Sequence, residues 1–542
     1  MSHPKSNQDD FVESTEDDPA KSATQGDFGK QDGALNLLED VGHSTILTPE
    51  NNKTTLRKID LRLLPILLSI YFLQQLDKST LSYASVFGLI EDANLHGQMY
   101  SWLGSVIYLA QLVFQPLVSY LLVKVPLGKF LAASTLLWGI ALTCMTPADN
   151  FGKLLVCRIF LGVFEAGIGE FCDLLTMMHI LTMYWTAPAF IAVTQMWYRR
   201  MEQPVRLGSW YAMNGVVNMF GSLITYGLGH IKSSIFAPYQ IIFLFFGLIT
   251  VATSAAVLIF MPDSPVSAKF LPEKDKLQGV ENHDWKWDHV KEAFFDLKSW
   301  GWFSLTIATS IPSGGITTFG PLIVKSFGFN DLNTILLNIP FGAVQLIATM
   351  GGAWLATAWK MKGPVLALLC LPPIAGCVIL LQIPHDESHK GPLLAGYYII
   401  SVYPAITPLI YSWSASNTAG ETKKKVVTGI MYAGQCVGNV IGPNLYTTEE
   451  APLYRRGLLS NLALFCVLVV LNLVIMAYLL FLNKNHEQWR AAAGKNSRVI
   501  DHSMLAVGSA PVDKETTMPQ VASDHAFRDV TDRKNEDFVF VY

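Results

Sequence analysis

The chain has 542 residues, of which 51% are hydrophobic and only 15% charged, with a net charge of −4. An average soluble domain carries roughly 25% charged residues, so the composition excludes an ordinary soluble enzyme or nucleic-acid-binding protein. Most of the negative charge lies in residues 1–52, which hold eleven acidic side chains and three lysines. We therefore predict a disordered acidic tail over residues 1–62, followed by an integral membrane protein.

Long apolar runs fill the middle of the chain. A helix needs about 20 apolar residues to cross a bilayer, and the sequence after the acidic tail offers twelve such segments. The fold class predicted is therefore an all-α polytopic membrane protein with 12 transmembrane helices. The predicted spans are 63–84, 98–121, 129–147, 153–198, 206–229, 240–261, 303–325, 333–358, 363–383, 391–415, 426–446 and 457–482.

Charges in the connecting loops give the orientation. Alternate loops are rich in cations, and the loops between them are mostly acidic or neutral. The cation-rich loops contain Lys124, Lys129, Arg199, Arg200, Arg206, Lys360, Lys362, Lys423, Lys424 and Lys425. Because positively charged loops stay inside, both termini are predicted to be cytosolic, including a C-terminal tail over 483–542.

The spans divide into two groups of six. Residues 262–302 form the longest internal polar stretch, in which Trp287, Val290, Phe294 and Leu297 recur at helical spacing. That spacing predicts a helix on the cytosolic membrane surface. The expected architecture is two six-helix bundles, 63–261 and 303–482, that rock about a central site.

Buried charges are costly in a membrane, by about 2.5–3.5 kcal/mol each, and usually functional. The candidates are Asp77 and Lys78 in the first span, and Arg158 and Glu165 in the fourth. At 1.5 Å rise per residue, Glu165 and Asp77 lie near the midplane, where a carboxylate cannot reach water. We predict that both carry the coupling proton; the alternative is a permanently neutral acid bonded to a neighbouring helix.

Arg158 precedes Glu165 by seven residues, which is two helical turns, so both lie on one helix face. A guanidinium binds a carboxylate in bidentate fashion, and Arg158 is therefore predicted to bind an anionic substrate. The alternative is that it extends outward to the interface. Lys78 points about 100° away from Asp77 on the helix, and an ion pair is its alternative role.

Neutral polar residues recur at corresponding positions of the two halves. Each either bonds a neighbouring helix or faces the substrate, and their recurrence favours the substrate. The predicted substrate-binding residues are Arg158, Gln111 and Gln345 in the second and eighth spans, Asn214 and Asn218 in the fifth, Gln435 and Asn439 in the eleventh, and Tyr403.

Small residues predict two packing features. Gly434, Gly438 and Gly442 form a ridge suited to close helix contact. Ser313 to Gly315 follow Pro312 in the seventh span. This second pattern predicts either a broken helix that aims backbone groups at a ligand or a simple packing kink.

Several long segments are similar to one known family. They include RKIDLRLLPILLSIYFLQQLDKSTLSYASVFGL (57–89), RRMEQPVRLGSW (199–210) and GYYIISVYPAITPLIYSWSASNTAG (396–420). The chain resembles the fungal allantoate permease family, the anion:cation symporter branch of the major facilitator superfamily. The resemblance implies a proton-coupled importer of allantoate, ureidosuccinate, a dipeptide, nicotinate or pantothenate. The segment RIFLGVFE is similar to the family's fourth span, where the resemblance assigns the arginine, Arg158 here, to the substrate anion.

Other classes of function are less compatible with the sequence. The twelve histidines mostly lie in tails and loops without a nucleophile motif, and the seven cysteines lie in apolar segments without metal-ligand spacing. We therefore expect no enzyme activity, cofactor, metal or nucleic-acid partner, and a monomer in the plasma membrane. The alternative is a transporter-like nutrient sensor, whose signalling would persist without transport.

The fourth span is too long for one crossing, because residues 153–198 stay apolar for 46 residues. A second crossing would move Lys423, Lys424 and Lys425 outside, against the positive-inside pattern. One crossing with an insert at 170–187 is the better account, and removing the insert restores a family-like EAGIAPAF segment. We hypothesise that residues 170–186 are a retained intron translated in frame; the alternative is a genuine insertion.

Sequencing of the transcript tests this hypothesis. We expect messages that lack these codons and join codons 169 and 187 into one alanine. The chain without residues 170–186 should transport, and the 542-residue chain should transport poorly because its fourth span is disrupted below Glu165. A message population in which every copy retains the codons would contradict the hypothesis.

Overall fold

The computed structural model describes residues 64–124, 127–166, 203–260, 286–385, 387–492, 530–535 and 538–542. Helices are the regular secondary structure of these residues, as predicted. The acidic tail over 1–62 and the insert at 170–187 lie outside the described residues.

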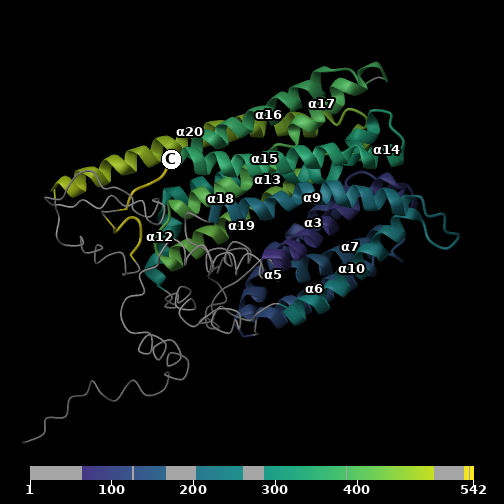
Figure 1. The fold of residues 1–542 in the computed structure, drawn as a ribbon, viewed down its shortest axis with the longest axis horizontal. Coiled ribbons are helices and arrows are strands. Elements are labelled where there is room, and N and C mark those ends of the chain that lie inside the picture. Colours follow the sequence, from purple (N-terminus) through teal and green to yellow (C-terminus); the bar gives the residue numbers. More distant parts are fainter. Residues whose placement is uncertain are drawn as a thin grey trace, which may run out of the picture.

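The first six predicted spans correspond to six long helices. Their bounds agree with the prediction within a few residues, apart from the fourth span, of which α7 is the described part. The helices are α3 (Leu64–Val86), α5 (Met99–Lys124), α6 (Leu127–Thr143), α7 (Phe151–Ala166), α9 (Gln203–Gly229) and α10 (Pro238–Phe260). In this half α6 packs on α7 and α10, α5 packs on α7, and α3 packs on α9 and α10 (Figure 1).

The second half contains the remaining six spans. They are α13 (Leu297–Ser326), α14 with α15 (Asp331–Leu336, Asn338–Trp359), α16 (Gly363–Gln382), α17 with η4 and α18 (Lys390–Ile400, Tyr403–Ala405, Ile406–Ser416), α19 (Glu421–Asn444) and α20 (Arg455–Ala492). Three helices extend well beyond their predicted spans: α13 begins at Leu297, before 303, α19 begins at Glu421, before 426, and α20 continues past 482 to Ala492. Among the described residues, six helices are long and apolar enough to cross a membrane by length and composition alone.

The break expected in the seventh span lies instead in the tenth. Helix α13 is continuous through Pro312. Helix α17 ends at Ile400, four residues before Pro404. Because proline has no N–H to donate to the carbonyl four residues earlier, the chain passes through a 3-10 turn before α18. In α13, a Cβ on Gly315 would lie 2.5 Å from the Tyr446 ring, so the packing alternative holds there.

The predicted glycine ridge of α19 is confirmed. A Cβ added to Gly434 would lie 3.0 Å from Phe303, one on Gly438 would lie 2.6 Å from Ser310, and one on Gly442 would lie 2.2 Å from the carbonyl of Ile311. All three neighbours lie on α13. The absence of side chains therefore lets the α13 and α19 backbones approach each other closely.

The two halves meet at the end of the bundle where α3 ends and α5 begins. The Tyr100 hydroxyl donates to the carbonyl of Thr318 at 2.8 Å, and the Ser101 hydroxyl donates to the carbonyl of Tyr446 at 3.0 Å. The Lys325 ammonium donates to the carbonyl of Val86 at 3.0 Å. This end, predicted to face outward, is called the outer end below. The opposite end, which carries α12 (Trp287–Phe295) and residues 530–542, is called the inner end (Figure 1).

Helix α12 confirms the helix predicted before the seventh span, and its position on the membrane surface stays a prediction. His289, Val290 and Ala293 are buried, whereas Trp287 is 42% and Leu297 63% exposed. The reason is that α12 packs against α13 and α19, so its small residues turn toward the bundle. The large apolar side chains are left at its surface.

Lys362, just before α16, is buried at the inner end, and its ammonium donates to the carbonyl of Ser412 at 2.9 Å and to the Ser416 hydroxyl. Burial lowers the pKa of Lys362 from its ordinary 10.5 to about 7. Between these two values the unfolded chain binds a proton that the folded chain does not. The free energy of unfolding should therefore rise with pH from about 7 to 10.5, by up to about 1.4 kcal/mol per unit.

Thermal unfolding of the purified protein at pH 7 and pH 9 measures this effect. Lys362→Met should reduce the rise in stability between the two pH values. Lys360→Met, at an exposed neighbouring position, should leave the rise unchanged. An equal rise in the wild type and Lys362→Met would contradict the assignment.

Candidate functional site

A buried ion pair joins the first and fourth spans. The Lys78 ammonium on α3 lies 2.7 Å from Oε1 of Glu165 on α7, with side-chain exposures of 13% and 1%. Lys78 points away from its neighbour Asp77, as the helical geometry predicted, and takes the ion-pair role. This contact links α3 to α7 in the buried interior of the first half.

Asp77 is also buried but has a weaker set of contacts. The Thr250 hydroxyl of α10 donates to Oδ2 of Asp77 at 3.3 Å, and Oδ1 has no hydrogen-bond partner among the described residues. Asp77 lies close enough to Glu165 and Arg158 for direct electrostatic interaction. Because no cation forms an ion pair with it in the described part of the chain, Asp77 is the carboxyl best placed to be neutral.

Arg158 lies inside the bundle rather than at its surface. It is 1% exposed and lies on the buried face of α7 together with Leu161, Gly162 and Glu165. A Cβ on Gly162 would lie 2.6 Å from the carbonyl of Ile107, so the glycine allows this face to approach α5. The predicted shared face of Arg158 and Glu165 is therefore confirmed, and the alternative of an outward-extending arginine is wrong for this conformation.

The guanidinium of Arg158 has unused donors. Its Nε and Nη2 atoms have no hydrogen-bond acceptor among the described residues. Its electrostatic neighbours are Tyr100, Glu165, Tyr108 and Asp77. Since a guanidinium can present two parallel N–H donors to a carboxylate, this arrangement suits the binding of an anion.

Tyrosines lie beside the charged residues, and sequence reasoning missed them. The Lys78 ammonium lies 5.4 Å from the centre of the Tyr108 ring, a cation–π distance. Tyr71, two turns before Lys78 on α3, lies 6.1 Å from the Tyr211 ring. Helical spacing alone could not single out Tyr71 and Tyr108, because aromatic residues are common throughout the chain.

The amide residues divide between contacts across the two halves and contacts within one half. Across the halves, Asn218 of α9 donates to Oε1 of Gln345 of α15 at 2.7 Å, and the Tyr432 hydroxyl of α19 donates to Oε1 of Gln111 of α5 at 3.3 Å. The second and eighth spans thus play corresponding roles, as their predicted equivalence implied. Gln111 bonds to α19 of the second half and Gln345 bonds to α9 of the first half, rather than the two glutamines bonding to each other.

The other predicted amides bond within their own half. Asn214 donates to the Tyr211 carbonyl at 3.0 Å, and Asn439 donates to the Gln435 carbonyl at 2.9 Å. The Tyr411 hydroxyl donates to Oε1 of Gln435 at 2.8 Å. The Asn214 and Asn439 bonds go to the backbone of their own helices, and Asn214 also donates to the Tyr71 hydroxyl of the neighbouring α3 at 3.5 Å.

Tyr403 is the predicted residue that lies at the break in the tenth span. Its hydroxyl lies 3.5 Å from the Thr317 hydroxyl of α13. The break places a buried aromatic hydroxyl and an interrupted backbone beside α13. Among the described residues, its hydrogen-bond neighbours are thus hydroxyl groups of α13 and not the charged residues of α3 and α7.

The site is closed from the outer end in this structure. The ring of Tyr100, in the first half, lies 5.2 Å from Phe319 in edge-on contact, and Phe319 stacks on Tyr446 at 5.1 Å. Ser105 adds a hydrogen bond to the carbonyl of Val440 at 2.9 Å. Aromatic packing and hydrogen bonds between the halves therefore lie between the charged residues and the outer end.

Comparisons with known proteins agree on one superfamily. The profile described as the Major Facilitator Superfamily matches residues 67–169 and 174–443. An uncharacterised transporter of Schizosaccharomyces pombe is 32% identical over 81% of this chain and 82% of its own. The allantoate permease of Saccharomyces cerevisiae is 28% identical, over 86% of each chain. A thiamine pathway transporter of the same yeast is 30% identical, over 91% of this chain and 87% of its own.

Solved structures support the fold. An inward-facing, unoccupied bacterial homologue of the human lysosomal transporter Spinster superposes with a TM-score of 0.52 at 13% identity. The match covers 77% of this chain and 95% of that protein. At this level of identity the likeness concerns the fold alone.

Proposed function

The chain belongs to the Major Facilitator Superfamily, among its fungal allantoate-permease-like transporters, and we propose that it is a proton-coupled symporter for a small organic anion. It is a multi-pass integral membrane transporter. The proposed substrates are allantoate, ureidosuccinate or a related carboxylate, imported across the plasma membrane by alternating access. Protons and the anion are its proposed partners, and the proposed unit is a monomer.

The observation that carries the proposal is the buried set of Asp77, Lys78, Arg158 and Glu165. When all four are ionised, two cations neutralise two carboxylates. A proton on Asp77 leaves one positive charge in excess, and a carboxylate bound at Arg158 restores neutrality. Proton and anion therefore each favour binding of the other, which is the reciprocal coupling that symport requires.

The residues have different proposed roles. Arg158 binds the substrate carboxylate, because its guanidinium is buried and has unused donors. Asp77 takes up the proton. Glu165, which is paired with Lys78 here, leaves this ion pair for another partner during the transport cycle. Gln111, Asn218, Gln345 and Gln435 bind neutral polar groups of the substrate when their present partners separate. Asn214, Asn439 and Tyr403 are proposed to join them in another conformation.

A second candidate substrate class is a vitamin-type carboxylate such as nicotinate or pantothenate. A relative named as a thiamine pathway transporter is 30% identical, and a vitamin that bears a carboxylate satisfies the same charge balance at Arg158. A dipeptide is compatible with the same charge balance when its carboxylate binds Arg158. In a transporter-like sensor, signalling would persist in a variant that no longer transports.

Uptake by intact cells tests the function. The chain is expressed in a host that lacks uptake of labelled allantoate, ureidosuccinate, nicotinate, pantothenate and a dipeptide. We expect one carboxylate to accumulate, faster at external pH 5 than at pH 7, and a protonophore to abolish accumulation. Accumulation that survives the protonophore would exclude proton coupling. Failure with every anion, in both the 542-residue chain and the chain without residues 170–186, would exclude the proposed substrate class.

A further inference from the structure

The last residues of the chain lie against the inner end of the second half. Residues 530–535 and 538–542 run beside α12, the α18–α19 connection and α20 (Figure 1). Within this segment Thr531, Asp532, Phe538 and Phe540 are buried. These described parts of the predicted cytosolic tail are therefore packed against the inner end of the bundle.

An ion cluster holds the first part of the segment. Oδ1 of Asp532 lies 2.9 Å from the Lys423 ammonium and accepts from the Ala419 amide at 3.1 Å. Oδ2 of Asp532 accepts from the Lys298 ammonium. The Thr531 hydroxyl donates to Glu292 of α12 at 2.8 Å. The segment thus supplies the acid that lies between two buried lysines from different helices.

Asp532 is charged at cytosolic pH. Burial alone would raise its pKa, but Lys298 and Lys423 outweigh burial and hold the pKa below its ordinary value. The Asp532 carboxylate therefore stays ionised at neutral pH and takes up a proton only below the ordinary range of an aspartate.

Two side-chain amides bind the backbone of the last part. Asn483 of α20 donates to the Phe540 carbonyl and accepts from the Phe540 amide, both at 2.8 Å. Asn417, between α18 and α19, does the same for Val541, also at 2.8 Å in both bonds. Trp413 donates to the same Val541 carbonyl at 2.7 Å. A primary amide offers one donor face and one acceptor face, so each asparagine satisfies both backbone groups of one residue.

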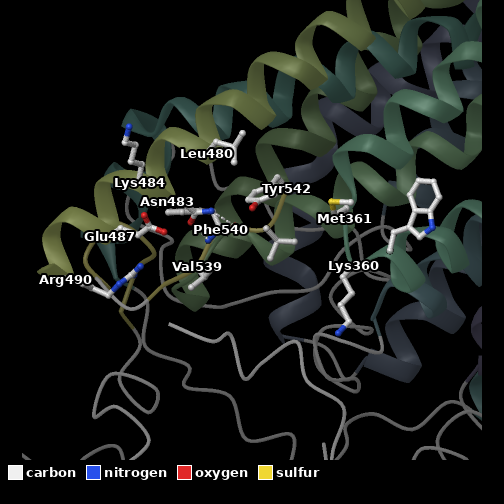
Figure 2. A pocket seen from close by; sticks show the side chains of 12 residues that line it. Lys360, Met361, Leu480, Asn483, Lys484, Glu487, Arg490, Val539, Phe540 and Tyr542 are labelled. Atoms are coloured by element: carbon white, nitrogen blue, oxygen red, sulfur yellow. Dashed lines mark hydrogen bonds between the residues drawn. The ribbon is translucent and has the colours of Figure 1, made fainter. Parts of the chain in front are cut away.

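Aromatic contacts at Phe538 and Phe540 give the inner end a preference for particular side chains at these positions. The Phe540 ring lies 5.2 Å from His486 and 5.0 Å from Phe538, and the Lys298 ammonium lies 4.3 Å from its centre. A cavity of about 930 Å³ lies beside Val539–Tyr542 and is lined on the other side by α20 residues such as Leu480 and Glu487 (Figure 2).

We propose that the inner end of the second half is a peptide-binding site, occupied in cis by residues 530–542, which act as a releasable latch. Its described contacts all belong to the second half: α12, α13, α18, α19, α20 and the residue before α16. The latch therefore ties helix ends within one bundle and does not fasten the two bundles to each other.

The latch also bears on transport. Helix α18, whose Trp413 binds the latch, packs against α9 of the first half. Occupancy by the latch therefore fixes a helix that forms part of the interface between the halves. Release should change the rate at which the inner end opens and closes, and so the transport rate. This consequence does not depend on which substrate is carried.

The site can be tested with the segment supplied as a separate molecule. The 37 residues 493–529 join the latch to α20, and this covalent attachment raises the effective concentration of the latch at the site. A fluorescent peptide of residues 530–542 should bind a chain truncated after residue 529 and bind the full chain at least tenfold more weakly, because the tethered copy competes. Peptides with Asp532→Asn or Phe540→Ala should bind at least tenfold more weakly than the native peptide.

A peptide with Lys534→Gln is the matched control, because Lys534 is exposed and its change should leave binding unaltered. Addition of the native peptide should return the truncated chain's transport rate toward that of the full chain. Equal binding to the truncated and full chains, or equal binding of a scrambled peptide, would overturn the proposal.

Hydrogen exchange on the full chain gives a test that does not depend on the truncated chain folding. The Phe540 and Val541 amides should exchange at least a hundredfold more slowly than in the free peptide. Asn483→Ala should accelerate Phe540 exchange more than Val541 exchange, and Asn417→Ala should do the reverse. Exchange of both amides at the free-peptide rate in the full chain would overturn the proposal.

Discussion

Glu165→Gln is expected to abolish uphill uptake while exchange of labelled for unlabelled substrate continues. Glutamine has nearly the shape of glutamate but carries no charge, so Lys78 loses the partner 2.7 Å away. The cycle then lacks the carboxylate that compensates Lys78 when the proton and anion leave. For one-to-one symport, the wild type should accumulate a monovalent anion about tenfold per unit of pH difference, because one pH unit is about 1.4 kcal/mol.

Proteoliposomes with an imposed pH gradient measure accumulation and exchange separately. Removing one partner of a buried pair destabilises a protein by about 3–5 kcal/mol, so stability must be controlled. The Lys78→Met/Glu165→Gln double variant removes both charges and should recover stability without recovering uphill uptake. Wild-type accumulation in Glu165→Gln would remove Glu165 from the coupling role.

Asp77→Asn extends the same prediction to the second acid. Asparagine imitates the neutral carboxyl permanently, and it can keep the contact with Thr250. We expect substrate affinity to become independent of pH between 5 and 7, with loss of accumulation. A pH dependence equal to that of the wild type would assign the proton to another group.

Arg158→Lys is expected to reduce substrate affinity about 10- to 100-fold, because hydrogen bonds to charged groups contribute about 1.5–3 kcal/mol. Lysine keeps the positive charge but loses the planar pair of N–H donors. Nε and Nη2 of Arg158 have no acceptor among the described residues, so a substrate carboxylate would be their partner. An uncharged amide analogue of the substrate should lose much less affinity than the acid.

Binding of acid and amide analogues to purified variants checks this prediction. Arg455→Lys is the control, because Arg455 is exposed at the outer end and should leave both affinities unchanged. Equal losses for acid and amide in Arg158→Lys would show that the arginine acts on the fold and not on the carboxylate.

Much of the candidate site was predictable from helical spacing. Arg158 and Glu165 lie on one buried face of α7 because seven residues are almost two full turns. Lys78 turns away from Asp77 for the same reason, since consecutive residues point about 100° apart. The glycines of α19 contact α13 because small residues at four-residue spacing present bare backbone on one face.

Other features had no signal in local spacing. The sequence placed a candidate break at Pro312 because a proline followed by glycines is a common helix breaker. In the structure α13 is continuous, because Gly314 packs closely against Asn439 of α19 and Gly315 against Tyr446, just after α19. The break occurs at Pro404, where the sequence predicted an uninterrupted span. Packing between helices decided which proline interrupts its helix.

The sequence by itself determined the membrane class, the twelve spans, their approximate bounds and the charged residues of the site. These features follow from apolar length and helical period, which are local properties of the chain. Only the tertiary structure decided which polar groups meet. Lys78 reaches Glu165, Asn218 reaches Gln345, and Asp532 reaches Lys298 across 234 residues of chain. Such contacts depend on the rotation and packing of helices distant in sequence, and no short segment of the sequence records them.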